Sequence, residues 1–274
     1  MSEPAHPRRC VLVAVDMERY SPRDNLRQYR AQQLFREVMA EAVASVGLER
    51  ASWTTQQSGD GELAILPADT SELTVVADFV PALDRILREH NRNLLPGAKV
   101  RLRVAIHQGL VHLTGANGFP GEAVVEVCRL LDAEPLRQAL SAFPAASVAL
   151  IVSRSIFDDV VRHGYHGLRP ERFAQVRVAV KQLATTAWIS VPDEDAGAIA
   201  WDAPVAPVAP VAPVAPVAPV APVAPEKEPP PAKPDPVPAT YQISGVTTHG
   251  PAVFGPGGTA IGSVHGPWNG RGDQ

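Results

Sequence analysis

The sequence is poor in cysteine and has no long apolar run. Its only two cysteines, Cys10 and Cys128, both lie in apolar surroundings. Two cysteines exclude a disulfide framework and a zinc-type cysteine cluster, and they are typical of a reducing compartment. The apolar run at residues 11–15 follows a polar stretch and is far too short for a signal-peptide core or a membrane span. We therefore expect a cytoplasmic protein that makes no membrane contact.

An excess of positive charge is also absent. The chain has 25 Lys and Arg against 29 Asp and Glu, which gives a formal net charge of −4 at pH 7. A protein that binds nucleic acid through bulk positive charge has the opposite balance. Nucleic acid is therefore not an expected partner, whereas a small anionic ligand stays possible because a few local groups can hold it.

Proline divides the 274 residues into three parts. Half of the 28 prolines lie between residues 203 and 238, and Ala-Pro-Val repeats with period three over residues 203–225. Proline at every third position prevents helix and sheet pairing and favours an extended polyproline-II chain. We expect a globular domain over 9–192, a disordered Ala-Pro-Val-rich spacer over 193–240, and a Gly-rich tail over 241–274. The alternative use of the repeat, as an SH3-type ligand, is disfavoured because no arginine lies nearby.

The globular part alternates short apolar runs with stretches of helical spacing. Such runs predict strands, and apolar residues three and four positions apart predict helices. The order indicates an α+β sandwich, a sheet with helices on one face. Strands are expected at about 11–15, 53–57, 62–66, 101–106, 110–113, 148–152, 173–180 and 186–191, and helices at 26–46, 71–93, 122–140 (interrupted near Pro135) and 153–163. Residues 58–61, with an Asp-Gly pair, predict a tight hairpin.

Two aspartates are the centre of the functional hypothesis. Asp16 ends the first apolar strand, and Asp60 lies at the tip of the expected hairpin. If the hairpin pairs beside the first strand, both carboxylates meet at one edge of the sheet. Two carboxylates with few other ligands suit Mg²⁺ or Mn²⁺, which take oxygen ligands and share them with phosphate. From spacing alone, a strand-end cap and an ordinary Asp-Gly turn remain the alternative.

Four sequence stretches resemble the motifs of class III nucleotidyl cyclases, the adenylate and guanylate cyclase family. Residues 15–21 (VDMERYS) resemble the first metal motif, and residues 58–61 (SGDG) resemble the second. Residues 103–109 (RVAIHQG) are similar to the strand and turn that follow, and residues 121–130 (GEAVVEVCRL) to the helix with the transition-state residues. The motifs stand in family order, and the pattern is similar to that of divergent cyclase-homology proteins of actinobacterial type.

The resemblance implies a ferredoxin-like cyclase sandwich with a mixed sheet. It also implies a cyclisation reaction. In the family, the 3′-hydroxyl of a nucleoside triphosphate attacks its own α-phosphate, and pyrophosphate is released. The resemblance assigns the divalent cations, Mg²⁺ or Mn²⁺, to Asp16 and Asp60, with the Met17 carbonyl as a further ligand. It implies a two-metal lyase that serves bacterial signalling.

Three more residues match family positions. Arg129 matches the arginine that stabilises charge on the phosphoryl group, and Lys181 resembles a lysine that contacts the triphosphate. Gln56 lies near one of the two base-selecting positions, and Asn117 or Gly118 lies near the other. In the family the metals and the arginine come from different protomers, so the resemblance also implies a homodimer.

Two departures from the family pattern favour a second hypothesis. Val125 stands where the family usually has an asparagine that orients the ribose, and Gln56 fits neither the adenine code nor the guanine code. The base is therefore open. The lead hypothesis is a cyclase, and the alternative is a catalytically impaired nucleotide sensor or scaffold.

The Gly-rich tail over 241–274 repeats a His-Gly-Pro triplet and carries little charge. It resembles prion-like bacterial signalling motifs, whose identical segments stack as β-arches. This resemblance implies that the tail recruits an effector protein. A disordered Gly-rich end is the alternative.

Overall fold

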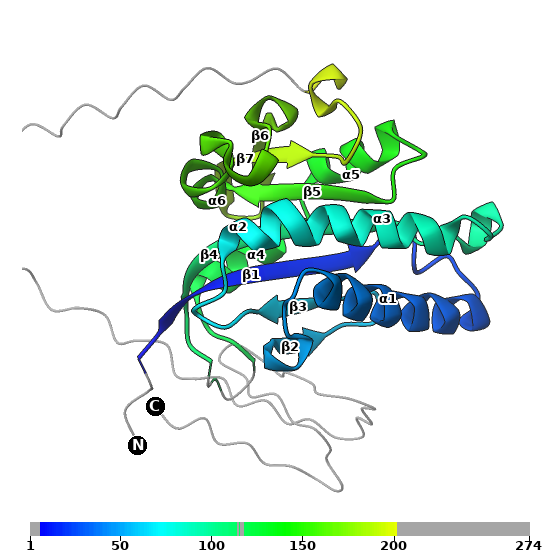
Figure 1. Cartoon of the computed structure of the whole chain (residues 1–274), viewed down its shortest axis with the longest axis horizontal. Coiled ribbons are helices and arrows are strands. Elements are labelled where there is room, and N and C mark those ends of the chain that lie inside the picture. The colour runs from blue at the N-terminus through cyan, green and yellow to red at the C-terminus, as the bar shows by residue number, and fades with distance from the viewer. Residues whose placement is uncertain (1–5, 114, 116–117, 202–274) are drawn as a thin grey trace, which may run out of the picture. The chain divides into compact units, whose positions relative to one another are not determined.

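The computed structural model describes residues 6–113, 115 and 118–201 (Figure 1). The expected tail over 241–274 and the spacer beyond residue 201 lie outside the described residues. The description below therefore concerns the part of the chain that was expected to be globular.

A seven-stranded sheet runs through the centre of the fold in the order β2-β3-β1-β4-β5-β7-β6. Neighbouring strands are antiparallel except β4 and β5, which are parallel, so the sheet is mixed as expected. The strands are β1 (Arg8–Met17), β2 (Thr54–Gln57), β3 (Gly61–Ile65), β4 (Leu102–Val111), β5 (Val148–Ser153), β6 (Ala174–Val180) and β7 (Leu183–Ser190).

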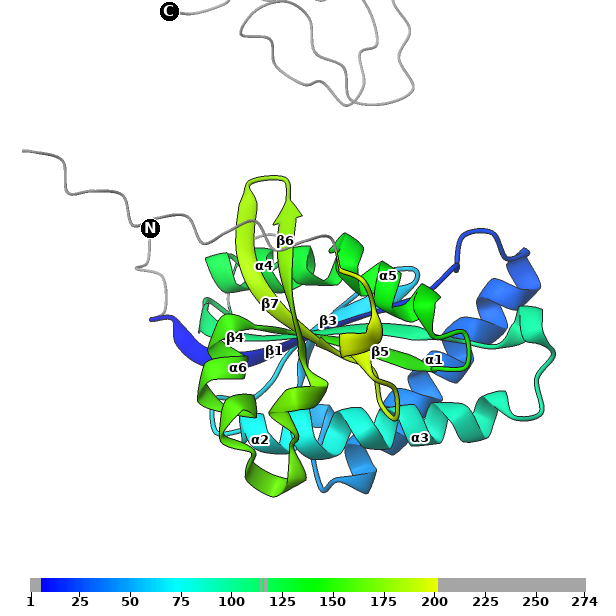
Figure 2. The same ribbon diagram turned by 90° about the horizontal axis from the view of Figure 1, so that it is seen from above.

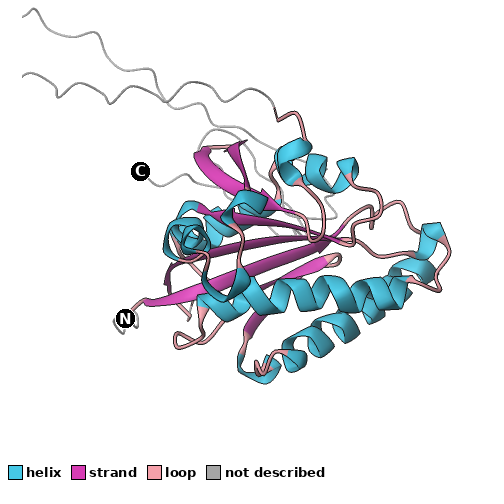
Figure 3. Cartoon of the chain, turned by 45° about the horizontal axis from the view of Figure 1, so that its top comes forward, coloured by secondary structure: helices cyan, strands magenta, loops and turns pink. Residues whose placement is uncertain are grey.

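Helices cover both faces of this sheet (Figures 2 and 3). They are α1 (Asn25–Ser45), α2 (Glu72–Thr74), α3 (Val80–Asn91), α4 (Glu122–Leu131), α5 (Glu134–Ala142) and α6 (Arg154–Asp159), and a π-helical turn, Val75–Phe79, joins α2 to α3. Apolar residues of α1, α3 and α6 form one core, and those of α4 and α5 form a second. No helix in the described part is long and apolar enough to cross a membrane.

The α+β class is confirmed, but the expectation of helices on only one face is wrong. The physical reason is visible in β1, where Val13 and Val15 belong to the first core while Leu12 and Ala14 belong to the second. Successive side chains of a strand point to opposite faces. An uninterrupted apolar strand is therefore buried on both sides, and each side needs a covering layer.

The expected helix boundaries largely agree with the structure. The Asp24 side chain accepts a hydrogen bond from the Arg27 amide and begins α1, and Gly47, with φ of 72°, follows its end. The Ser153 hydroxyl accepts a hydrogen bond from the Ile156 amide and begins α6, as expected of an N-cap. The interruption near Pro135 is also present, because α4 ends before it and α5 begins with it.

The expected pair of strands at 101–106 and 110–113 is instead one strand, β4. Gly109, which lies between the two expected strands, is within β4 and not at a turn. A Cβ atom placed there would lie 2.6 Å from the Cβ of Ala123 on α4. Glycine at this position therefore allows the helix to approach the sheet closely.

The folded part also continues past the expected boundary at residue 192. Ala196 is fully buried, and the Trp201 indole donates a hydrogen bond to its carbonyl at 3.1 Å. The Gln138 side chain on α5 donates to the Ala200 carbonyl at 3.4 Å. Residues 193–201 therefore pack on the domain instead of belonging to the spacer.

Candidate active site

The two aspartates of the functional hypothesis lie at the same end of neighbouring strands. Asp16 near the end of β1 pairs across the sheet with Gly61, the first residue of β3. The Met17 amide donates a hydrogen bond to the Asp60 carbonyl at 2.8 Å. A side chain at residue 61 would collide with the Val15 carbonyl oxygen, so glycine is what permits this close backbone approach. The structure thus brings Asp16, Met17 and Asp60 together.

The hairpin that carries Asp60 is held from the other side by α1. The Gln32 side chain donates a hydrogen bond to the Gly59 carbonyl at 2.6 Å. A hollow of about 180 Å³ lies here, with Met17, Arg36 and Gln57 among its lining residues. The hairpin tip is therefore fixed between β1 and α1 beside an open space.

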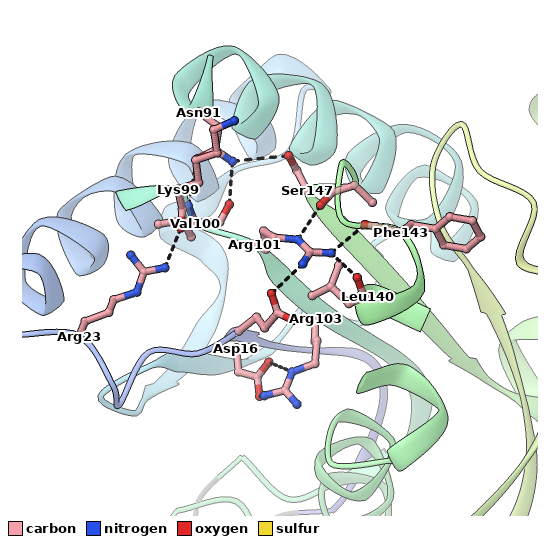
Figure 4. A network of polar contacts seen from close by, with 12 residues as sticks. Asp16, Arg23, Asn91, Lys99, Val100, Arg101, Arg103, Leu140, Phe143 and Ser147 are labelled. Carbon is pink, nitrogen blue, oxygen red and sulfur yellow. Dashed lines mark hydrogen bonds and ion pairs between the residues drawn. The ribbon is translucent and has the colours of Figure 1, made fainter. Parts of the chain in front are cut away.

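Asp16 makes a two-point ion pair with Arg103, its cross-strand partner on β4. The guanidinium Nε and Nη2 donate to the two carboxylate oxygens at 2.8 and 2.7 Å (Figure 4). Both side chains are 14% exposed. The pKa of Asp16 is raised to about 6, mainly because the carboxyl is buried; Arg103 opposes this rise, and the charges of Asp60 and Asp132 add to it.

A second ion pair lies beside the first. Arg101 donates to the Glu18 carboxylate at 2.9 Å. Its guanidinium also donates to the carbonyl oxygens of Ala146 at 2.8 Å, of Phe143 at 2.9 Å and of Leu140 (Figure 4). Arg101 therefore ties the end of α5 and the following loop to the sheet, which is a structural role.

The donor set around Asp16 fits a hard divalent cation. Its groups are the carboxylates of Asp16 and Asp60 and the nearby main-chain carbonyl of Met17, and such cations prefer oxygen ligands. Within the described ranges, no group of three or more His, Cys, Asp or Glu side chains forms a ready metal cluster. Oxygen atoms from water or from a phosphate would therefore have to complete the coordination of a cation bound here.

Arg129 lies in the last turn of α4, which packs on the sheet face toward which Asp16 points. It is half-buried, and no hydrogen bond or ion pair joins its side chain to another described residue. Val125, one turn earlier, is 46% exposed. The two positions thus form one accessible side of α4, but nothing in the described chain links Arg129 to the acid pair.

The expected base-facing positions are close to each other. Gln56 lies on β2 with an exposed side chain. Its amide oxygen is 3.2 Å from the point where a Cβ of Gly118 would lie. Asn117, the other expected candidate, is outside the described residues.

Lys181 lies far from the acid pair in the sheet. It is exposed at the tip of the β6–β7 hairpin and has φ of 54°. The strand β6 is the edge of the sheet, and β4, β5 and β7 separate it from β1. Within one chain, Lys181 is therefore not part of the group formed by Asp16, Met17 and Asp60.

The pairing of Arg103 with Asp16 was not foreseen from the sequence. Its signal lies in the register, because β1 and β4 place these two residues opposite each other on one face. Without the register, the sequence indicates only that Arg103 is one of the polar residues in a strand that alternates polar and apolar positions.

Comparison with known proteins supports the fold assignment. No protein-family model matches the sequence, and no curated protein matches it. Among solved structures, an adenylate/guanylate cyclase/hydrolase from Silicibacter pomeroyi has a TM-score of 0.50 at 20% identity and covers 69% of this chain and 100% of its own. The guanylyl cyclase Cya2 has a TM-score of 0.49 at 16% identity, covering 70% of this chain and 96% of its own. The first of these structures shows that the chain has the fold of an adenylate/guanylate cyclase catalytic domain.

Proposed function

We propose that this domain is a divergent class III nucleotidyl cyclase that acts in bacterial signalling. In the reaction, the 3′-oxygen of a nucleoside triphosphate forms a bond to the α-phosphorus, the bond from that phosphorus to pyrophosphate breaks, and the hydroxyl loses its proton. The products are a 3′,5′-cyclic nucleotide and pyrophosphate. The observation that carries the proposal is the convergence of Asp16 and Asp60 at one end of β1 and β3.

In this proposal the acid pair holds Mg²⁺ or Mn²⁺ together with the Met17 carbonyl. When bound, the ions neutralise phosphate charge and lower the pKa of the attacking hydroxyl. Arg129 supplies positive charge to the phosphoryl group as it reacts, and Lys181 contacts the triphosphate. Gln56 faces the base.

The arrangement of these groups supports a homodimer as the active unit. Arg129 has no partner among the described residues, and Lys181 lies on the far edge of the sheet from Asp16. Leu110, which is 54% exposed, lies close to the start of α4, and Val125 on that helix is 46% exposed. An exposed apolar surface beside an unpaired arginine is typical of a protein interface. A second copy docked there would bring its Arg129 to the acid pair of the first.

The experiment is incubation of the purified full chain with each of the four ribonucleoside triphosphates and Mn²⁺. We expect a cyclic product and pyrophosphate in equal amounts from at least one of them. Asp60→Ala removes one carboxylate at the hairpin turn and should reduce the rate by about two orders of magnitude or more, the effect of losing a principal electrostatic group. No product from any triphosphate would contradict the proposal.

A second function, a nucleotide sensor or scaffold, is favoured by one observation. Val125 presents an apolar side chain where the family has an asparagine, and it is exposed on the accessible side of α4. In this alternative the domain binds a triphosphate without turnover, and residues 241–274 recruit an effector protein. Tight Mn²⁺-dependent nucleotide binding without product in the same experiment would select this alternative.

A further inference from the structure

Arg103 differs from Arg101, the other half-buried arginine beside it, in its hydrogen-bond partners. Among the described residues, its side chain has one hydrogen-bond and ion-pair partner, the Asp16 carboxylate. Arg101, two residues earlier on the same face, divides its hydrogen bonds between Glu18 and three main-chain carbonyls. Arg101 thus holds the fold together, whereas Arg103 serves a single carboxylate.

The geometry of this pair leaves little of Asp16 for another cation. The guanidinium uses both carboxylate oxygens at 2.7–2.8 Å, in the planar two-point arrangement that arginine favours. Both side chains are 14% exposed, so water screens the pair only weakly. A divalent cation that approaches Asp16 therefore meets a full positive charge at contact distance.

We propose that Arg103 is the resident counter-cation of Asp16 and that it competes with the divalent cation for this carboxylate. The inference rests on the proposed function, because it assigns the cation site to Asp16 and Asp60. Cation binding then requires Arg103 to give up at least one of its two hydrogen bonds. The ion pair consequently sets the lowest cation concentration at which the site fills.

The surroundings allow Arg103 to make this exchange. In the described part, its side chain donates no hydrogen bond to a main-chain carbonyl that would fix it in place. Asp132, at the end of α4, acts electrostatically on Asp16 from the same face and has a side chain that is 59% exposed. Its carboxylate lies 3.5 Å from Arg137 through one oxygen, and its other oxygen is an alternative acceptor for a guanidinium that has been displaced from Asp16.

The test is the affinity of the full chain for Mn²⁺ alone, measured by titration calorimetry without nucleotide. Arg103→Met keeps much of the side-chain length and removes the charge. A neighbouring positive charge typically lowers the pKa of a carboxyl group by about 1–3, which measures how strongly it stabilises the ionised carboxylate. We therefore expect the dissociation constant of Arg103→Met for Mn²⁺ to be at least about tenfold lower than that of wild type. Arg103→Lys keeps the charge without the two-point geometry and should give an intermediate value.

Two controls make the result specific. Arg85→Met removes an arginine from an exposed pair with Glu89 on α3, and it should leave the Mn²⁺ affinity within about twofold of wild type. Asp16→Asn in the Arg103→Met background should abolish the gain. Thermal melting shows which variants are folded, and Arg103→Lys carries the test if Arg103→Met does not fold.

The outcomes separate the inference from the proposed function. Tighter Mn²⁺ binding by Arg103→Met, lost with Asp16→Asn, supports the inference. Equal or weaker binding, with wild type still binding Mn²⁺ through Asp16, overturns it and leaves the proposed cation site in place. If neither wild type nor Arg103→Met binds Mn²⁺ at millimolar concentration, the inference and the cation site are both contradicted.

Discussion

At the scale of single residues, the environment of Asp16 determines what the site can do. Burial and the charge of Asp60 raise the pKa of this carboxyl while Arg103 lowers it, and the net result is a pKa of about 6. Two acidic groups that repel each other gain most from a cation placed between them. The ionised form that the proposed cation site requires is therefore present at neutral pH and is lost as the pH falls through 6.

Val125 is the residue at which the chain departs most clearly from the cyclase pattern, and it gives the first prediction. Val125→Asn places an amide one helical turn before Arg129, on a position that is already 46% exposed. Restoring a group that orients the ribose should raise kcat by about tenfold or more with little change in KM. Steady-state kinetics with the preferred triphosphate measures this. Val125→Leu is the matched control, and an equal gain in both variants would contradict an orienting role.

His107 gives a second residue-scale prediction, about stability and pH. Its side chain is buried, its Nδ1 has no hydrogen-bond partner among the described residues, and the nearest Glu126 oxygen is 3.7 Å away. Burial, with a smaller effect of Arg9, lowers the pKa of His107 from 6.5 to about 4. The unfolded chain therefore binds the proton more readily, so stability is lost as pH falls from 6.5 towards 4. The loss approaches about 3 kcal/mol at its largest.

Urea unfolding between pH 4 and 7 measures this effect when wild type is compared with His107→Gln. Asp16 acts in the opposite direction, because its raised pKa makes its contribution to stability fall as pH rises from 3.8 to about 6. The raised pKa of Glu126 acts in the same direction as that of Asp16. The difference between the two proteins isolates the histidine. A difference that stays constant with pH would show that His107 does not titrate in this way.

At the scale of elements, the hairpin between β2 and β3 positions Asp60, and its two glycines give a matched pair of variants. A Cβ at Gly61 would collide with the Val15 carbonyl, whereas a Cβ at Gly59 meets nothing within 4 Å. Gly61→Ala should therefore lower the free energy of unfolding by about 3 kcal/mol or more, because backbone must move. Gly59→Ala should stay within about 0.5 kcal/mol of wild type. Chemical denaturation tests both, and equal effects would contradict this account of the hairpin.

Much of this element structure could be predicted from the sequence, because its signals are local. The apolar run of β1, the Asp-Gly turn and the caps at Asp24 and Ser153 each depend on a few neighbouring residues. The long strand β4 could not be predicted, since Gly109 serves a contact with α4 and not a turn. The ion pair between Arg103 and Asp16 could not be predicted either, because it depends on the register of β1 and β4, which is also a contact between distant parts of the chain.

At the scale of the whole molecule, the residues of the proposed site are not all brought together within one chain. Asp16 and Asp60 lie at one end of the sheet, while Arg129 and Lys181 have no described contact with them. A two-fold dimer resolves this separation, because the same surface of each copy faces the other and generates two equivalent sites. The proposed function therefore predicts that each site takes its acids from one copy and its arginine from the other.

Complementation between two inactive variants tests this central claim most directly. Asp60→Ala and Arg129→Ala should each be nearly inactive alone, since every site lacks one essential group. In an equal mixture that exchanges subunits, half of the dimers are mixed, and one of their two sites is intact, so activity should return to about a quarter of wild type. Cyclic nucleotide formation is measured before and after mixing. No recovery, with subunit exchange verified, would contradict a site shared between two copies.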